Sequence, residues 1–117
     1  MGAMAIITVN YGSGTAAEAA AWVKCSNVTN HYDFKYWEVG NECYGSYETD
    51  NHARPHDPYT YATNFAAYAQ QMRAADPTIK IGVVLDLDPT ADSNGYTDHP
   101  ATNIYTGAVL YGWTPLC

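Results

Sequence analysis

Three short apolar runs, at residues 5–10, 36–39 and 79–85, organise the first part of the chain. Each run is rich in β-branched or aromatic residues, which favour strands. Residues 5–10 have no polar alternation, a pattern typical of a strand covered on both faces in a parallel sheet. The pattern therefore predicts three short strands, with the first covered on both sides.

The segment after the first run has the signature of an amphipathic helix. Thr15 and Glu18 have the spacing of a capping box, in which each side chain accepts a hydrogen bond from a backbone N–H of the other residue. The helix is expected to fade over residues 27–30. The residues that share its buried face are predicted to be Ala19, Trp22, Val23 and Ser26.

A second helix is predicted to begin at Asp57, because an N-cap Asp followed by Pro58 is a strong helix start. Asp76 and Pro77 are predicted to end this helix. Its buried face is marked by residues that recur at helical spacing, namely Tyr61, Phe65, Tyr68 and Met72.

The predicted order of elements is strand, helix, strand, helix, strand. Right-handed crossovers would place the three strands side by side and parallel, which gives an α/β fold. Residues 86–117 are rich in Asp, Asn, Thr, Gly and Pro, and we expect them to be mostly irregular, with one short element near residues 108–110. An irregular segment of this length is unusual in a compact domain, and we expect it to be an active-site loop without the helix that would follow it. Residues 1–117 are expected to form a single domain.

Composition excludes several classes of function. The 117 residues carry a net charge of −7, and only 15% of them are charged. Binding of nucleic acid needs clustered Lys and Arg, so no nucleic-acid partner is expected. No apolar run approaches the roughly 20 residues of a membrane helix, so no membrane partner is expected. The three cysteines, Cys25, Cys43 and Cys117, form no disulfide framework.

Chemistry is concentrated at the end of the second run, where Asn41 and Glu42 follow the predicted strand. In parallel α/β proteins, ligands bind at the carboxyl ends of the strands. A carboxylic acid presented there can donate a proton to a substrate. This position makes Glu42 the strongest candidate for a general acid.

Residues 36–42, Tyr-Trp-Glu-Val-Gly-Asn-Glu, resemble the acid/base motif of a clan of retaining glycoside hydrolases built on the (β/α)8 barrel. Residues 7–15 resemble the third strand and loop of the members related to α-L-arabinofuranosidases and cellulases, and residues 76–82 resemble the approach to the fifth strand. A complete barrel takes about 250 residues. The resemblance therefore implies a partial barrel covering about strands three to five.

The resemblance also implies roles for individual residues. Glu42 would be the general acid/base, and Asn41 would hydrogen-bond the 2-hydroxyl group of the sugar. The nucleophile of the family is a second Glu at the tip of the seventh strand, and no segment of this chain corresponds to that strand. No cofactor is implied.

A second carboxylate is needed for glycoside hydrolysis. Glu38 lies four residues before Glu42, which is roughly 13 Å along a strand and too far for a catalytic pair; we expect it to be a buried structural carboxylate. Asp86 and Asp88 follow the third strand and are the best partners within this chain, although both residues also suit the start of a turn. Glu48 is a weaker candidate.

Aromatic and amide side chains near the strand tips are candidates for contacts with sugar. The substrate-binding candidates are Asn10, Tyr11, Asn41, Tyr44 and Tyr47, and the alternative role of each ring is packing. Trp37 is expected to pack. Cys43 follows the acid but has no evident His partner, so a thiol nucleophile is a minor alternative.

No metal site is expected. His52 and His56 have the spacing of a metal pair on a helix, but Pro55 lies between them.

Three hypotheses of function follow. The first is a glycoside hydrolase acting on plant-type carbohydrate, with a β-1,4-glucan as the first expected substrate and an arabinofuranoside as the second. The others are a non-catalytic carbohydrate-binding segment and an inert fragment. Three parallel strands leave two unpaired sheet edges, so we also expect a homo-oligomer in which copies cover these edges.

Overall fold

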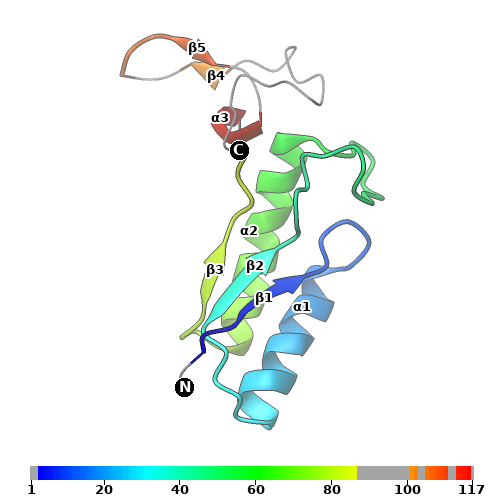
Figure 1. Ribbon diagram of the computed structural model, residues 1–117, viewed down its shortest axis with the longest axis vertical. Coiled ribbons are helices and arrows are strands. Elements are labelled where there is room, and N and C mark those ends of the chain that lie inside the picture. The colour runs from blue at the N-terminus through cyan, green and yellow to red at the C-terminus, as the bar shows by residue number, and fades with distance from the viewer. Residues whose placement is uncertain (1–2, 87–100, 103–104, 111–112, 117) are drawn as a thin grey trace.

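A computed structural model describes residues 3–86, 101–102, 105–110 and 113–116 (Figure 1). Its elements follow the predicted alternation of strands and helices before a less regular carboxyl-terminal segment. In chain order they are β1 (Ile6–Val9), α1 (Ala16–Val23), a π-helical extension η1 (Lys24–Thr29), β2 (Tyr36–Val39), α2 (Pro58–Ala75), β3 (Lys80–Gly82), β4 (Ala101–Thr102), β5 (Val109–Leu110) and α3 (Trp113–Leu116).

The first three strands form a parallel sheet in the order β1-β2-β3. Ile7 pairs with Trp37, which in turn pairs with Ile81. This arrangement confirms the α/β prediction with three parallel strands. The ladder of β3 ends at Gly82, three residues earlier than the apolar run predicted. The short strands β4 and β5 pair separately, as an antiparallel ladder.

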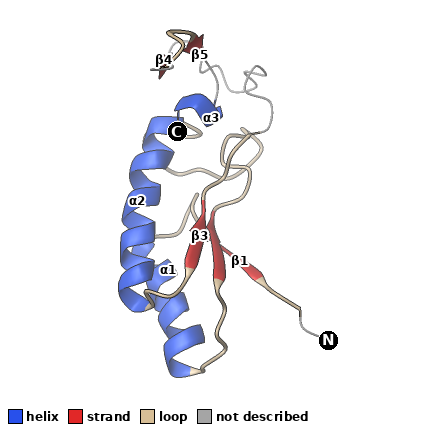
Figure 2. Cartoon of the chain, turned by 90° about the vertical axis from the view of Figure 1, so that its left-hand side faces the viewer, coloured by secondary structure: helices blue, strands red, loops and turns tan. Residues whose placement is uncertain are grey.

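Both long helices lie on the same side of the sheet (Figure 2). The side chains of Val9, Trp37 and Val39 point to this side and are at most 1% exposed. The opposite face carries Ile6, which is 69% exposed, and Glu38, which is half-buried. The predictions that β1 is covered on both faces and that Glu38 is buried are therefore wrong, because no helix covers this second face in the described chain.

The predicted capping box opens α1. The Thr15 backbone N–H donates to Glu18 Oε2 at 2.7 Å, and the Glu18 backbone N–H donates to Thr15 Oγ1 at 3.2 Å. Ala19 and Val23 are buried as expected. Trp22 is 47% exposed, and its ring meets the Trp37 ring edge-on at 5.9 Å. Its position at the outer margin of the core explains why its burial is incomplete.

The second helix also begins as predicted. The side chain of Asp57 caps α2 by accepting hydrogen bonds from the Thr60 N–H at 2.8 Å and the Thr60 hydroxyl at 2.6 Å. Tyr61, Tyr68 and Met72 are buried along one face. This face packs against the sheet and carries hydroxyl groups toward the ends of the strands.

Two tyrosines of α2 hydrogen-bond to the backbone at the ends of the strands. Tyr68 donates to the Asn10 carbonyl oxygen at 3.0 Å, directly after β1. Tyr61 donates to the Val39 carbonyl oxygen at 2.8 Å and accepts from the Val84 N–H at 2.9 Å. The carboxyl ends of all three strands are thus hydrogen-bonded to one helix.

The carboxyl-terminal helix α3 returns to the same end of the sheet. Trp113 is 3% exposed and donates its indole N–H to the Val84 carbonyl oxygen at 3.0 Å. Its ring lies 5.0 Å from the Tyr61 ring. Within the part of the chain that the structure describes, no helix is long and apolar enough to cross a membrane.

Candidate active site

The chain turns sharply where β2 ends. Gly40 has a φ of +79°, and Glu42 has a φ of +42°. A Cβ atom on Gly40 would lie 2.3 Å from Cys43 Sγ and 2.9 Å from the Tyr11 Cβ, so only glycine fits. Glu42 adopts the left-handed backbone region that non-glycine residues rarely occupy. The backbone therefore directs the Glu42 side chain, and strand alternation no longer applies.

Glu42 is exposed at this tip. Its Oε2 atom accepts a hydrogen bond from the Tyr47 hydroxyl at 3.0 Å. Asn41 is also exposed, and its Nδ2 atom donates to Glu48 Oε1 at 3.4 Å. The structure thus brings together Asn41, Glu42, Tyr47 and Glu48 from one loop.

Tyr44 and Asp86 extend this cluster toward the end of β3. The Tyr44 ring meets the Trp113 ring edge-on at 6.0 Å. Desolvation, followed by the negative charges of Glu42 and Asp86, raises the pKa of the Tyr44 phenol. Tyr44 contacts Trp113 and Asp86 contacts Thr114, so helix α3 links the loop after β2 to the segment after β3.

Asp86 is half-buried, and hydrogen bonds hold its backbone in place. Its backbone N–H donates to the Thr114 hydroxyl at 2.8 Å, and its carbonyl oxygen accepts from the same hydroxyl at 2.6 Å. The helix α3 therefore fixes the backbone of Asp86. Asp88, the other predicted partner carboxylate, lies outside the described residues.

Asn10 and Tyr11 occupy the neighbouring tip of β1. The Asn10 side chain makes two hydrogen bonds to Ser13. Its Nδ2 atom donates to Ser13 Oγ at 2.9 Å, and its Oδ1 atom accepts from the Ser13 backbone N–H at 3.2 Å. Tyr11 is only 3% exposed. Its ring stacks on the His52 ring with centroids 4.5 Å apart, and its hydroxyl accepts from Asn64 at 3.2 Å. Tyr11 thus packs as a buried support beneath the tip, and burial raises its pKa.

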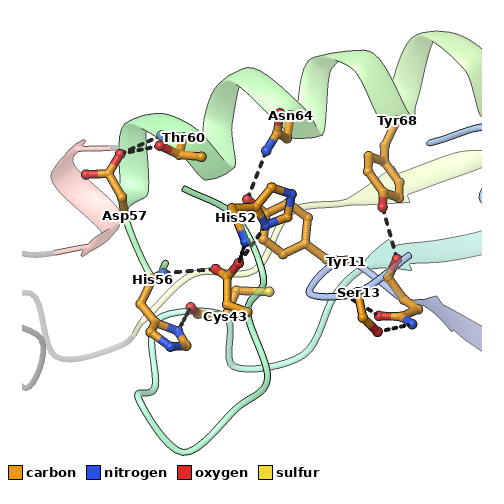
Figure 3. A network of polar contacts seen from close by, with 11 residues as sticks. Tyr11, Ser13, Cys43, His52, His56, Asp57, Thr60, Asn64 and Tyr68 are labelled. Atoms are coloured by element: carbon orange, nitrogen blue, oxygen red, sulfur yellow. Dashed lines mark hydrogen bonds and ion pairs between the residues drawn. The ribbon is translucent and has the colours of Figure 1, made fainter. Parts of the chain in front are cut away.

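A buried carboxylate that sequence reasoning did not single out organises the loop after Glu42. Asp50 Oδ1 lies 3.0 Å from the His52 backbone nitrogen and 2.6 Å from His52 Nδ1, while Oδ2 accepts from the His56 backbone N–H at 2.9 Å. Figure 3 shows the His52 ring beside this carboxylate, whereas His56 meets it through its backbone N–H and turns its ring toward Cys43. The contact from Asp50 to a backbone N–H two residues later is an Asx-turn, and a turn-prone Asp before a polar run is its sequence signal.

Two further contacts hold this loop against the strand tips. His56 Nδ1 lies 3.0 Å from the Cys43 carbonyl oxygen. The Asn51 N–H donates to the Gly12 carbonyl oxygen at 2.8 Å. The Asp50 carboxylate and these contacts together give the acid-bearing loop a defined conformation.

Cys43 does not have the environment of a nucleophile. It is 5% exposed, and burial raises the pKa of its thiol to about 12. The thiolate is the reactive form, so this thiol is inert near neutral pH. Among the described residues, no group of three or more His, Cys, Asp or Glu side chains is placed to hold a metal ion.

A cavity of about 290 Å³ lies between the tips of β1 and β2 and the loop that follows β2. This volume is close to the lower limit for small-molecule sites, roughly 300 Å³. Its polar lining includes Asn10, Asn41, Glu48, Asp50 and His56. Asn41 lines the cavity and Glu42 does not, and the polar part of the lining offers amide, carboxylate and imidazole groups to a ligand.

Comparisons with known proteins relate this chain to α-L-arabinofuranosidases. No protein-family profile matches the chain. The probable α-L-arabinofuranosidase C of Aspergillus clavatus is 30% identical in an alignment of 104 positions that covers 76% of this chain and 20% of that protein. The α-L-arabinofuranosidase C of Emericella nidulans is 27% identical in an alignment of 106 positions that covers 78% of this chain. The chain spans about a fifth of the length of these curated relatives.

A solved structure gives the same result in three dimensions. The crystal structure of α-L-arabinofuranosidase from Thermotoga maritima in complex with arabinose matches 72% of this chain and 20% of that chain. The TM-score is 0.62, and the sequence identity is 29%. The resemblance inferred from residues 7–15, 36–42 and 76–82 is thereby confirmed. The chain is related to a segment of the α-L-arabinofuranosidases, glycoside hydrolases of the (β/α)8-barrel fold.

Proposed function

We propose that this chain carries the acid/base part of a glycoside hydrolase site that cleaves α-L-arabinofuranosides. The observation that carries the proposal is the position of Glu42, which lies at the tip of the central strand, directly after Asn41, a residue that lines the cavity. The names of the relatives favour the arabinofuranoside over the β-1,4-glucan that we expected first.

In the proposed reaction, Glu42 protonates the glycosidic oxygen as the bond to the anomeric carbon breaks. In a retaining mechanism, a second carboxylate bonds to the anomeric carbon as the leaving group departs, and Glu42 then removes a proton from the water that displaces this carboxylate. In an inverting mechanism, the second carboxylate instead removes the proton from the attacking water. Asn41 donates to the sugar hydroxyl next to the anomeric carbon, and this bond strengthens as positive charge develops on the sugar ring. Tyr44 and Tyr47 supply flat surfaces against which a sugar can pack.

Asp86 is the candidate second carboxylate within the described residues. Its charge and that of Glu42 both raise the pKa of Tyr44, after the larger effect of desolvation. Asp88 stays a second prediction for this carboxylate. A carboxyl separation of about 5–5.5 Å would favour retention of configuration, and about 6.5–9.5 Å would favour inversion. Asn10 and Tyr11 are proposed to form the polar rim and the buried support of the substrate cavity.

Hydrolysis of 4-nitrophenyl α-L-arabinofuranoside tests the proposal. Glu42→Gln is expected to lower kcat/KM by about 10²–10⁴-fold, because the variant keeps the shape of the side chain but cannot transfer a proton. Glu38→Gln is the matched control, since Glu38 lies in the same strand away from its tip. Equal rates for the wild type and Glu42→Gln would contradict the proposed role.

The substrate is tested by comparing this arabinofuranoside with 4-nitrophenyl β-cellobioside. We expect turnover of the first and none of the second. Preferential turnover of the cellobioside would instead support the β-1,4-glucan.

Carbohydrate binding without catalysis is the second candidate function. The observation that favours it is the cavity, whose polar lining does not depend on a second catalytic carboxylate. In this case, calorimetry would detect binding of arabino-oligosaccharides by the wild type and by Glu42→Gln, and neither protein would turn over the aryl glycosides.

We also propose that copies of the chain associate. Within the described sheet, β1 and β3 are edge strands, and Ile6 projects from the face that no described helix covers. Exposed edges and apolar residues favour pairing with another chain. Sedimentation velocity should show a concentration-dependent dimer or larger species, and a monomer at all concentrations would refute this proposal.

A further inference from the structure

We infer that Tyr47 is a positioning residue for Glu42, whose hydroxyl group holds the carboxylate in the orientation required for proton transfer. This inference rests on the proposed acid/base role of Glu42. It assigns to Tyr47 a function that depends on its hydroxyl group, whereas packing against a sugar depends on its ring.

The loop brings the two side chains together through two successive turns. The Gly45 N–H donates to the Glu42 carbonyl oxygen at 2.7 Å, and the Glu48 N–H donates to the Gly45 carbonyl oxygen at 3.0 Å. These turns fold the chain back so that the Tyr47 hydroxyl reaches Glu42 Oε2 at 3.0 Å. Backbone hydrogen bonds therefore support the contact between the side chains.

Gly45 provides the space that the tyrosine ring needs. A Cβ atom on this glycine would lie 2.4–2.8 Å from three carbon atoms of the Tyr47 ring. Contacts under 3.0 Å are sterically excluded, so the ring lies directly against the glycine backbone. A side chain at position 45 would push the ring, and with it the hydroxyl group, away from Glu42.

The hydrogen bond restricts a side chain that would otherwise sample several rotamers. Glu42 is exposed, and ordering a Glu side chain costs up to about 2 kcal/mol of conformational entropy. The left-handed backbone of Glu42 sets the direction of Cβ, and Tyr47 then holds Oε2. We assign the proton transfer to the other oxygen, Oε1.

The phenol is well suited to act as a permanent donor. The hydrogen bond to Glu42, followed by desolvation and the Glu42 charge, raises the pKa of Tyr47 to about 12. The hydroxyl group therefore stays protonated throughout the pH range in which a glycosidase works. It can stabilise the carboxylate that forms when Glu42 gives up its proton.

A purely aromatic role for Tyr47 makes a different prediction. The side chain is 71% exposed, so its ring can also contact a ligand. If only the ring matters, Tyr47→Phe will behave as the wild type. If the hydroxyl group positions Glu42, Tyr47→Phe will lower the rate of the step in which Glu42 transfers a proton.

The contact itself is tested without any measurement of activity. In protein labelled with ¹³C at the tyrosine Cζ atoms, the Tyr47 signal is assigned by its loss in Tyr47→Phe. We expect its pKa to fall from about 12 toward the ordinary 10 in Glu42→Gln and to stay unchanged in Glu38→Gln. The same titration in the wild type and Glu42→Gln would overturn the inference.

The catalytic consequence is tested with two arabinofuranosides that differ in leaving group. A 2,4-dinitrophenyl group leaves without acid assistance, whereas an alkyl alcohol needs a proton from Glu42. For Tyr47→Phe we expect kcat/KM to fall about tenfold with the alkyl glycoside, with KM unchanged, and to be unaffected with the dinitrophenyl glycoside. Gly45→Ala should reproduce this selective loss.

The possible outcomes separate the inference from the proposed function. If Glu42→Gln is inactive on the alkyl glycoside but Tyr47→Phe loses the same factor on both substrates, or none, the acid/base role stands and the positioning role fails. If the wild type turns over no arabinofuranoside, the proposed function fails. The tyrosine titration then still decides whether Tyr47 holds Glu42.

Discussion

The Tyr61 hydroxyl donates a hydrogen bond to the Val39 carbonyl oxygen, 2.8 Å away, at the point where β2 ends. Tyr61 is fully buried, and its hydroxyl also accepts from the Val84 N–H. A single side chain of α2 therefore satisfies one backbone acceptor at the end of β2 and one backbone donor two residues after β3.

Removing this hydroxyl group should destabilise the fold. Tyr61→Phe leaves both backbone groups without their partner in a buried place, which costs roughly 1–3 kcal/mol of unfolding free energy. Urea denaturation measures the loss. Tyr32→Phe is the control, because Tyr32 is 61% exposed, and we expect it to change the unfolding free energy by less than about 0.5 kcal/mol. Equal stabilities of the two variants would contradict this role of Tyr61.

The turn at Gly40 should tolerate no side chain. Gly40→Ala places a Cβ atom 2.3 Å from Cys43 Sγ and demands a positive φ, so we expect a loss of about 2 kcal/mol or more. Gly82→Ala is the matched control. Among the described residues, its Cβ would meet only the Trp37 carbonyl oxygen, at 3.6 Å, and thermal unfolding should show little change. Similar melting temperatures for both variants would refute the steric requirement at Gly40.

Asp50 should make stability depend on acid pH. Burial by itself raises the pKa of Asp50, but hydrogen bonds from the His56 and His52 backbone N–H groups and the His52 ring outweigh it, so the pKa falls below the usual 3.8. The stabilisation is present above pH 3.8 and is lost as the pH falls through the folded-state pKa. The difference in unfolding free energy between the wild type and Asp50→Asn should therefore be constant near neutral pH and shrink below about pH 3.8.

Asp33→Asn provides the comparison for this experiment, because the Asp33 side chain is 72% exposed. We expect it to have little effect on the unfolding free energy at neutral pH. A pH profile of Asp50→Asn that runs parallel to the wild type down to pH 2 would show that Asp50 does not act through its charge.

The cysteines should differ in reactivity. Cys25 is exposed, whereas Cys43 is buried with a pKa raised to about 12. With iodoacetamide at pH 8, mass spectrometry of peptides should find Cys25 alkylated and Cys43 unmodified. Denaturation in urea should expose Cys43 to the reagent. Rapid modification of Cys43 in the native protein would contradict its burial and reopen the thiol-nucleophile alternative.

The elements that sequence predicted well depend on local interactions. The Thr15–Glu18 capping box and the Asp57–Pro58 helix start involve residues at most three positions apart. The buried face of α2 follows from a helical repeat. The motif at residues 36–42 contains its own strand and turn, so the place of Glu42 at a strand tip was predictable.

The remaining features depend on contacts between residues that follow no repeating pattern in the sequence. The Trp113 contact with Val84 joins residues 29 positions apart, so local pattern carries no signal for it. The Asx-turn at Asp50 has a local signal, but the burial of its carboxylate does not. The burial of Tyr11 depends on the His52 ring and on α2. Cover on both faces of β1 was predicted wrongly, because apolar content does not reveal on which side the helices lie.

The hydrogen bonds from Tyr61 and Tyr68 have an implication for how this scaffold can change. Helix α2 contacts the ends of all three strands and so fixes their spacing from one side of the sheet. We therefore expect the loops beyond the strand ends to tolerate changes in length while the spacing of the strands is kept.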